Sequence, residues 1–287
     1  MNISNLKTIT IIGAGAMGTG ITSVAATAFP QSKILLIDSN EVQLKNASDR
    51  LEKWNRKDRL KNPEIQFAEV EFLGDFKQLA KFSAPDLVIE AASENMQVKE
   101  KIFSQINEFA TDETVLASNT SSLSLTKLAL CVNKERRKNT LGLHFFNPAR
   151  VMKLIEIIAA MDTSPETIEF ARELCTAMGK TSVVCKDAPG FITSRLGIVL
   201  INEALFALQE GLASAEEIDT AIKLGYNHPM GPLSLADFIG LDVVFSVTQT
   251  MFENFQDSKY RPPVLLRKLV EAGHFGRKTG KGIFKYS

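Results

Sequence analysis

A histidine and a glutamate twelve residues apart are the groups of this chain best suited to acid–base chemistry. His144 lies in the segment LHFFNP, and Glu156 lies in the apolar run LIEII. A carboxylate is costly to bury in such a run unless a partner pairs with it. An imidazole beside it would have a fixed tautomer and a stabilised imidazolium, which suits a general base or acid. The spacing alone leaves open whether His144 has this role or is a structural histidine.

A glycine-rich turn near the start of the chain is typical of dinucleotide binding. Gly13, Gly15 and Gly18 form the pattern GxGxxG, directly after an apolar β-branched run and at the start of a helical segment. In this pattern the first glycine permits a tight turn, the second lets the backbone approach a pyrophosphate, and the third lets helix pack on strand. The helix N-terminus adds free N–H groups and a partial positive charge.

The cofactor predicted from this turn is NAD. Asp38 ends the next apolar run, twenty residues after Gly18. Its carboxylate can accept hydrogen bonds from both ribose hydroxyls and would repel a 2′-phosphate. No Arg or Lys follows it as far as Val42, so NADP is disfavoured.

A cluster of short polar side chains, SNTSS from Ser118 to Ser122, follows another apolar run. If that run is a parallel strand, the cluster lies at the carboxyl end of the sheet, where ligands bind in doubly wound folds. Its hydroxyl and amide groups would fix a substrate oxygen or a nicotinamide. The alternative is that the cluster only caps the helix predicted over 123–130.

The glycine turn, Asp38 and the polar cluster can form one site only if the strands that precede them end at the same edge of a sheet. Short apolar runs alternate with helical segments over residues 1–186, which predicts a doubly wound, Rossmann-type α/β domain. The runs lack in/out alternation, as expected where helices cover both faces of a parallel sheet. Residues 41–81 form a charged helical stretch, in which the sequence pattern gives the weakest secondary-structure prediction of the chain. The predicted strands are Thr8 to Ile12, Lys33 to Ile37, Asp86 to Ala91, Thr114 to Ala117, Thr140 to Leu143, Leu154 to Ile158 and Thr181 to Val184.

Residues 187–287 are predicted to form a second, all-α domain. Ser214 and Glu217 form a capping box, and Gly273 is placed to end the last helix. His228 lies on a Pro-rich turn and is interpreted as structural. The first predicted helix of this domain has more apolar residues than a single amphipathic stripe needs. This excess favours burial of the helix against a second subunit. The predicted helices are Ile192 to Glu210, Glu216 to Leu224, Ser234 to Phe255 and Val264 to Ala272.

Composition excludes other classes. The 33 basic and 33 acidic residues give no overall field that would attract a polyanion, so neither nucleic acid nor an anionic membrane is an expected partner. No run approaches the ~20 apolar residues of a membrane span, and the start does not resemble a signal peptide. The three cysteines form no CxxC pair, so no metal site is expected and a reducing compartment, the cytoplasm, is predicted.

Seven segments taken together resemble the L-3-hydroxyacyl-CoA dehydrogenase family, and more narrowly its single-function bacterial members, the 3-hydroxybutyryl-CoA dehydrogenases. Besides the glycine turn, they are VIEA, ASNTSSL, the His144 segment running on to VMKL, PGF, HPMGP and the tail GRKTGKG. The similarity extends over almost the whole chain. It implies NAD-dependent, reversible oxidation of a 3-hydroxyacyl-CoA thioester to the 3-keto compound, and a homodimer formed through the helical domain.

The resemblance also implies roles for individual residues. His144 is the general base, Glu156 orients it, and Ser121 contacts both substrate and cofactor. The residues expected around NAD are Glu94, Lys99, Asn147 and Lys278.

Three departures from the family affect substrate binding. Ser194 stands where the family has an Asn that helps hold the substrate, and a hydroxyl offers one donor where an amide offers two. Arg150 stands where the family tends to have proline. The segment after Asp38 is shorter than the family hairpin that helps bind coenzyme A, which leaves the CoA contacts open. Cations that could still meet its phosphates are Lys53, Arg56, Lys57 and Arg59.

These departures keep two alternative functions open. One is an NAD-dependent dehydrogenase for a free 3-hydroxy acid, like the carnitine-type enzymes. The other is a nucleotide-binding relative with weak activity and a structural role. The presence of Ser121, His144 and Glu156 together argues against the second alternative.

Overall fold

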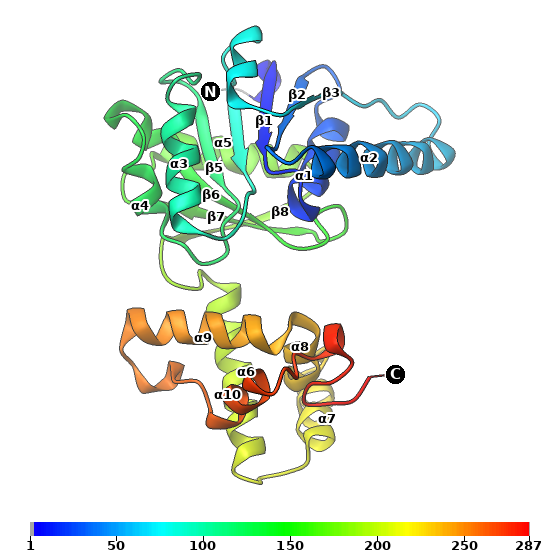
Figure 1. The fold of residues 1–287 in the computed structure, drawn as a ribbon, viewed down its shortest axis with the longest axis vertical. Coiled ribbons are helices and arrows are strands. Elements are labelled where there is room, and N and C mark those ends of the chain that lie inside the picture. The colour runs from blue at the N-terminus through cyan, green and yellow to red at the C-terminus, as the bar shows by residue number, and fades with distance from the viewer. Residues whose placement is uncertain (1–2, 287) are drawn as a thin grey trace. The chain divides into compact units, whose positions relative to one another are not determined.

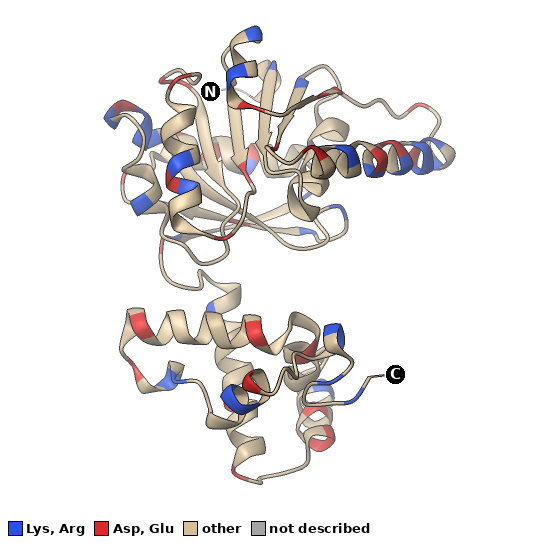
Figure 2. Ribbon diagram, in the orientation of Figure 1, with Lys and Arg blue, Asp and Glu red and all other residues tan. Residues whose placement is uncertain are grey.

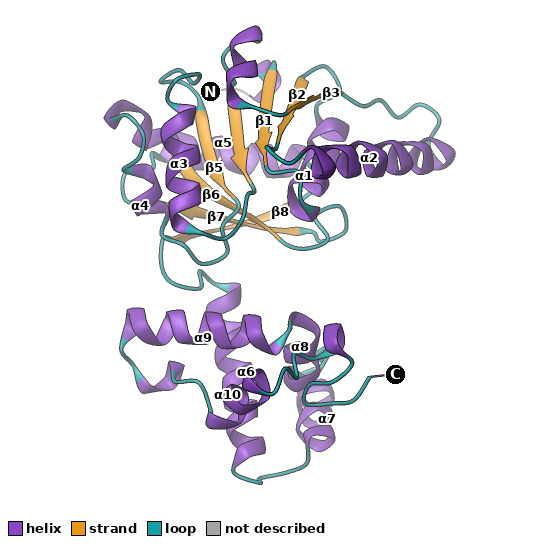
Figure 3. Cartoon of the chain, in the orientation of Figure 1, coloured by secondary structure: helices purple, strands orange, loops and turns teal. Residues whose placement is uncertain are grey.

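The computed structural model describes residues 3–286, and the chain divides into two compact units, Met1–Ala188 and Pro189–Ser287. The first unit is an α/β domain built on one eight-stranded sheet, and the second is helical (Figure 3). The predicted fold class, a Rossmann-type domain followed by an all-α domain, is confirmed. The division falls two residues after the predicted position. Asp187 stays with the first unit because its carboxylate accepts hydrogen bonds from Ser124 Oγ and Thr126 N.

The sheet has the strand order β3-β2-β1-β4-β5-β6-β7-β8. Helices lie on both of its faces, as Figure 1 shows. The strands are β1 Thr8–Ile12, β2 Lys33–Ile37, β3 Glu69–Leu73, β4 Leu87–Glu90, β5 Val115–Ser118, β6 Thr140–Phe145, β7 Leu154–Ala159 and β8 Thr181–Lys186. The helices of this unit are α1 Ala16–Ala28, α2 Glu41–Lys61, α3 Met96–Ile106, α4 Leu125–Ala129 and α5 Pro165–Ala177, with 3-10 turns at Ile3–Asn5, Phe76–Lys81 and Lys134–Asn139.

One pair of neighbouring strands departs from the parallel arrangement of the predicted sheet. β6 and β7 are antiparallel, whereas every other neighbouring pair is parallel. The chain makes this reversal through the short connection of residues 146–153, which has no room for a crossover helix. In the resulting register His144 lies directly opposite Glu156.

In the stretch 41–81 the α-helix ends at Lys61, and a short 3-10 turn follows at Phe76–Lys81. The strand β3 between the two was not predicted, since its sequence EVEFL carries charges and it pairs only with β2 at the edge of the sheet. An edge strand of this kind needs no continuous apolar run.

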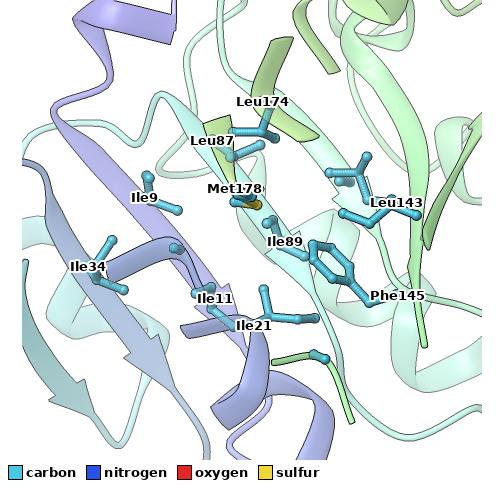
Figure 4. Close-up of a cluster of buried hydrophobic side chains, with 14 of the residues drawn as sticks. Ile9, Ile11, Ile21, Ile34, Leu87, Ile89, Leu143, Phe145, Leu174 and Met178 are labelled. Atoms are coloured by element: carbon cyan, nitrogen blue, oxygen red, sulfur yellow. The ribbon is translucent and has the colours of Figure 1, made fainter. Parts of the chain in front are cut away.

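The core of the first unit explains why the inner strands read as continuous apolar runs. Both faces of β1 and β4 are covered, and their side chains are almost completely buried. Figure 4 shows these side chains packed against residues of α1, α5 and β6. Full burial of one such side chain contributes roughly 1.5–3 kcal/mol, so this core fixes the strand ends that carry the polar residues. The residues concerned include Ile9, Ile11, Ile21, Leu87, Ile89, Leu143, Phe145 and Leu174.

The second unit contains α6 Thr193–Gln209, α7 Ala215–Gly225, α8 Pro232–Ile239, α9 Leu241–Phe255 and α10 Val264–Glu271, with 3-10 turns at Ser258–Tyr260 and Arg277–Thr279. The predicted capping box of Ser214 and Glu217 at α7 is confirmed. The single helix predicted from Ser234 to Phe255 is wrong, because Gly240 has φ +105° and breaks it into two helices bent by 100°. Among the described residues no single helix has the length and composition to cross a membrane, and α8 and α9 meet that test only as this bent pair.

Candidate active site

A cavity of about 750 Å³ lies at the carboxyl ends of β1, β2 and β4. Gly13 and Gly15 line it, together with Asp38. It sits at the point where the strand order reverses on either side of β1, which is where doubly wound folds bind nucleotides. The glycine turn is therefore placed as the sequence predicts.

The backbone of this turn fits a dinucleotide. Gly13 has φ +103°, and a Cβ there would lie 2.6 Å from the carbonyl oxygen of Ala91. A Cβ on Gly18 would collide with the Gly13 carbonyl oxygen at 1.7 Å, so this glycine allows α1 to approach the turn itself. Beside Gly15 nothing lies within 4 Å of an added Cβ, which leaves its backbone open to a ligand.

Asp38 braces the turn as well as lining the cavity. Its Oδ2 accepts a hydrogen bond from Ala14 N at 2.7 Å, and its Oδ1 accepts one from Asn40 N at 2.9 Å. Each carboxylate oxygen keeps a further lone pair for a ribose hydroxyl. Lys101 is the one basic residue among the described residues that line the cavity, so no cluster of cations is positioned for a 2′-phosphate.

His144 and Glu156 form a buried pair across β6 and β7. His144 Nδ1 lies 2.8 Å from Glu156 Oε2, and the two side chains are 7% and 0% exposed. Because a carboxylate accepts and does not donate, Nδ1 carries the proton and Nε2 is left as the basic nitrogen. The ring of Phe146 packs beside the imidazole with centroids 4.6 Å apart. Sequence spacing suggested this pair, and the antiparallel register forms it.

Ser121 completes a line of three side chains. Its Oγ lies 3.1 Å from His144 Nε2, on the side of the ring away from Glu156. With the tautomer assigned above, the serine hydroxyl donates to Nε2. The three predicted catalytic residues are thus brought together, and Nε2 faces a hydroxyl where a substrate alcohol would need to lie.

Glu94 fixes the loop that carries Ser121. Its Oε1 accepts hydrogen bonds from Thr120 Oγ1 at 2.7 Å, from Ser121 N at 2.9 Å and from Ser122 N at 3.1 Å. The alternative reading of the polar cluster as a helix cap is wrong for α4, because the side chain that caps this helix is Ser124.

Lys99 and Glu90 form a second buried ion pair. Lys99 Nζ lies 2.7 Å and 2.9 Å from the two carboxylate oxygens of Glu90, and both side chains are at most 1% exposed. Ser118 Oγ donates to Glu90 at 2.5 Å, and Glu94 lies 3.6 Å from the same ammonium. Lys99 therefore supports the Ser121 loop through Glu94, while its direct contact with NAD stays a prediction. Glu90 was quoted within the segment VIEA but given no role, although a carboxylate in an apolar run is the signal that identified Glu156.

Three further predicted residues, Asn147, Ser194 and Lys278, are described separately. Asn147, three residues after His144, precedes a cis bond to Pro148 and lines a separate cavity of about 350 Å³. Ser194 on α6 and Lys278 near the C-terminus belong to the second unit, where Lys278 Nζ lies 2.6 Å from Asp242. Within residues 3–286 no group of three His, Cys, Asp or Glu side chains is arranged to hold a metal ion.

Comparison with known proteins places this geometry in a family. Residues 8–188 match the NAD binding domain of 3-hydroxyacyl-CoA dehydrogenase, and residues 190–286 match its C-terminal domain. A probable 3-hydroxybutyryl-CoA dehydrogenase of Bacillus subtilis is 41% identical over 98% of both chains. A 3-hydroxybutyryl-CoA dehydrogenase of Bradyrhizobium diazoefficiens is 40% identical over 98% of this chain and 96% of its own.

A solved structure agrees with these sequence matches. The crystal structure of (S)-3-hydroxybutyryl-CoA dehydrogenase from Ralstonia eutropha superimposes with a TM-score of 0.89, with 38% identity, over 99% of this chain and 100% of that one. Matches of this extent cover both units and the connection between them. The chain belongs to the 3-hydroxyacyl-CoA dehydrogenase family and is an NAD-dependent enzyme.

Proposed function

We propose that this enzyme oxidises a short-chain L-3-hydroxyacyl-CoA, such as 3-hydroxybutyryl-CoA, reversibly to the 3-ketoacyl-CoA. The observation that carries the proposal is the line Ser121, His144, Glu156, with separations of 3.1 Å and 2.8 Å. The names of the relatives support the choice of a four-carbon thioester.

The three side chains divide the proton chemistry among them. His144 Nε2 accepts the proton of the substrate 3-hydroxyl, and Glu156 stabilises the imidazolium that forms. Ser121, already within hydrogen-bonding distance of Nε2, donates to the substrate oxygen and holds it beside the base. In the reverse direction the imidazolium returns the proton to the carbonyl oxygen.

The residues of the glycine turn would hold NAD, which when bound supplies the acceptor for the hydride leaving C3. Asp38 would accept from the adenosine ribose, and the N–H groups at the start of α1 would face the pyrophosphate. Burial of Glu156 at 0% exposure keeps water from competing for His144 Nδ1.

The second half of α2 supports a CoA thioester as substrate. Five basic residues occur in its last nine positions, against one acidic residue, Asp58. Figure 2 shows this crowding of charged residues along the helix. A CoA thioester carries several phosphate charges, so an enzyme with no net charge must bind it through a local cluster of this kind.

One assay tests the proposal. NADH absorbance is followed with acetoacetyl-CoA, then with free acetoacetate, and both are repeated with His144→Ala. We expect rapid oxidation with the thioester alone and a loss of about a thousandfold in kcat in the variant. Turnover confined to free acetoacetate would instead identify a free-acid dehydrogenase, and NADH binding without turnover would identify a structural relative.

We also infer a homodimer formed through the helical unit, in the cytoplasm, with a role in fatty-acid or four-carbon acid metabolism. Helix α6 buries only five of its 17 residues, and Leu196 on it is 66% exposed. Phe238 on α8 is 60% exposed. Surfaces of this kind favour association.

The proposed cytoplasmic location rests on the cysteines. All three are free, as in a reducing compartment.

A further inference from the structure

A buried lysine lies beneath the connection that joins the two catalytic strands. Lys180 is 9% exposed and directly precedes β8. Its Nζ donates hydrogen bonds to the carbonyl oxygen of Ala149 at 2.6 Å and to that of Met152 at 2.8 Å. Within residues 3–286 no carboxylate forms an ion pair with it.

The two carbonyls belong to the short turn between β6 and β7. Val151 N and Met152 N both donate to the carbonyl oxygen of Pro148, at 2.9 Å and 3.0 Å. Residues 148–152 therefore form a single helical turn. Its free carbonyls form the negative end of a small dipole, and an ammonium there binds two of them at once. The start of β8 adds one backbone bond, from Thr181 N to the Lys153 carbonyl.

Burial of the Lys180 ammonium costs free energy, which its hydrogen bonds to the two carbonyl oxygens must offset. Burial lowers the pKa of Lys180, and the charge of Lys153 lowers it further. An unpaired buried ammonium is unfavourable unless its donors are satisfied. The bonds to Ala149 and Met152 satisfy two of its three donors.

We propose that Lys180 is a positioning residue for the dehydrogenase reaction, holding the β6–β7 connection so that the groups it carries stay aligned. The connection begins just after His144 and ends just before Glu156, and Asn147 lies on it. Since these groups must hold substrate and cofactor within a few tenths of an ångström, loss of the two bonds misaligns the reacting atoms and lowers kcat. This role rests on the proposed function.

The test compares three variants of the full-length enzyme. Lys180→Met keeps the length of the side chain and removes its donors, whereas Lys180→Arg keeps a charged donor. Lys153→Met is the matched control, since it removes one positive charge from an exposed side chain of the same turn. For each variant, kcat and both KM values are measured with NADH and acetoacetyl-CoA, and folding is checked by thermal denaturation.

We expect kcat of Lys180→Met to fall about tenfold, Lys180→Arg to recover to within about threefold of wild type, and Lys153→Met to stay within about twofold. Hydrogen exchange by mass spectrometry should show faster exchange over residues 147–153 in Lys180→Met alone. If Lys180→Met does not fold, Lys180→Leu, which also lacks a donor, takes its place.

Two results would overturn the proposal. The first is wild-type kcat in a folded variant that lacks the donors, whatever its Tm. The second is a kcat for Lys180→Arg no better than that of Lys180→Met. An inactive wild-type enzyme would instead refute the proposed function, and the hydrogen-exchange comparison would still show whether Lys180 holds the turn.

Discussion

At the scale of single residues, the pair of His144 and Glu156 decides what the site can do. A carboxylate at Nδ1 leaves Nε2 as the acceptor, so the orientation of one proton determines whether the histidine can act as a base. Glu156 is completely buried and has the imidazole as a partner at 2.8 Å, so in the proposed mechanism its charge belongs to the catalytic group as well as to the fold.

Exchanging the carboxylate for an amide tests this reasoning. In Glu156→Gln the amide can donate to Nδ1, which would move the imidazole proton to Nε2 and remove the base. We expect kcat for acetoacetyl-CoA reduction to fall by about a hundredfold or more, with the protein still folded. Glu173→Gln, an exposed exchange on α5, is the control. A kcat within threefold of wild type in Glu156→Gln would show that the carboxylate does not set the tautomer.

Ser194 is one of the three positions at which the sequence analysis predicts a departure from the family pattern for substrate binding. It is half-buried near the start of α6. Because an amide offers one donor more than a hydroxyl, we expect Ser194→Asn to maintain or raise kcat on acetoacetyl-CoA. Ser194→Ala is measured beside it. A large loss in Ser194→Asn would show that the serine itself is required.

The cysteines are expected to be unreactive. Burial, followed by the charges of Glu156 and Asp187, raises the pKa of Cys185 to about 11, and burial raises the pKa of Cys175 to about 12. At pH 8 the thiolate population at Cys185 is then roughly two hundredfold smaller than in an unfolded chain, where the thiol pKa is about 8.5. We expect iodoacetamide to modify Cys185 at least about a hundredfold more slowly in the native enzyme than in urea, by peptide mass spectrometry. Equal rates would contradict this.

At the scale of elements, the reversal between β6 and β7 determines the active site. A parallel β7 would have run the other way, and His144 would not have faced Glu156 in register. The parallel pairing of β1 and β4 likewise fixes a neighbouring pair. Ile12 pairs with Glu90, so the glycine turn that follows Ile12 lies beside Glu90.

Helix α2 is the element expected to recognise the phosphates of coenzyme A. Its basic second half is exposed, with Arg56 78% exposed. We expect the double variant Arg56→Gln, Lys57→Gln to raise the KM for acetoacetyl-CoA by about tenfold and to leave kcat within twofold, since these side chains take no part in the proton transfer. The KM for acetoacetyl-pantetheine, which lacks those phosphates, should not change. Lys45→Gln in the first half of α2 is the control, and an equal effect on both thioesters would contradict the assignment.

At the scale of the whole molecule, the helical unit carries the apolar surface that a dimer would bury. We expect light scattering to give about twice the 31.6 kDa of the chain, and Leu196→Glu to shift the protein toward the monomer because it places a charge in the interface. Leu60→Glu, at a position on α2 that is 81% exposed, should leave the mass unchanged. A monomeric wild type at tens of micromolar would refute the dimer.

Local patterns in the amino-acid sequence are enough to predict the class of the fold and the kind of chemistry. The first unit is legible because its inner strands are buried on both faces and therefore read as apolar runs, and a carboxylate within such a run, as at Glu156, is conspicuous. The glycine turn is legible because backbone conformation, as at Gly13, restricts the residue type directly. Both signals are local properties of the chain.

Which side chains come into contact is visible only in the folded protein. The sequence did not predict β3, because an edge strand tolerates charged residues. It did not predict the break at Gly240, because the apolar periodicity continues across that residue. The antiparallel register, the buried pair of Lys99 and Glu90, and the bonds from Lys180 to its two carbonyls join residues distant in sequence. Such contacts depend on how elements pack, and packing is a property of the whole core that no local pattern encodes.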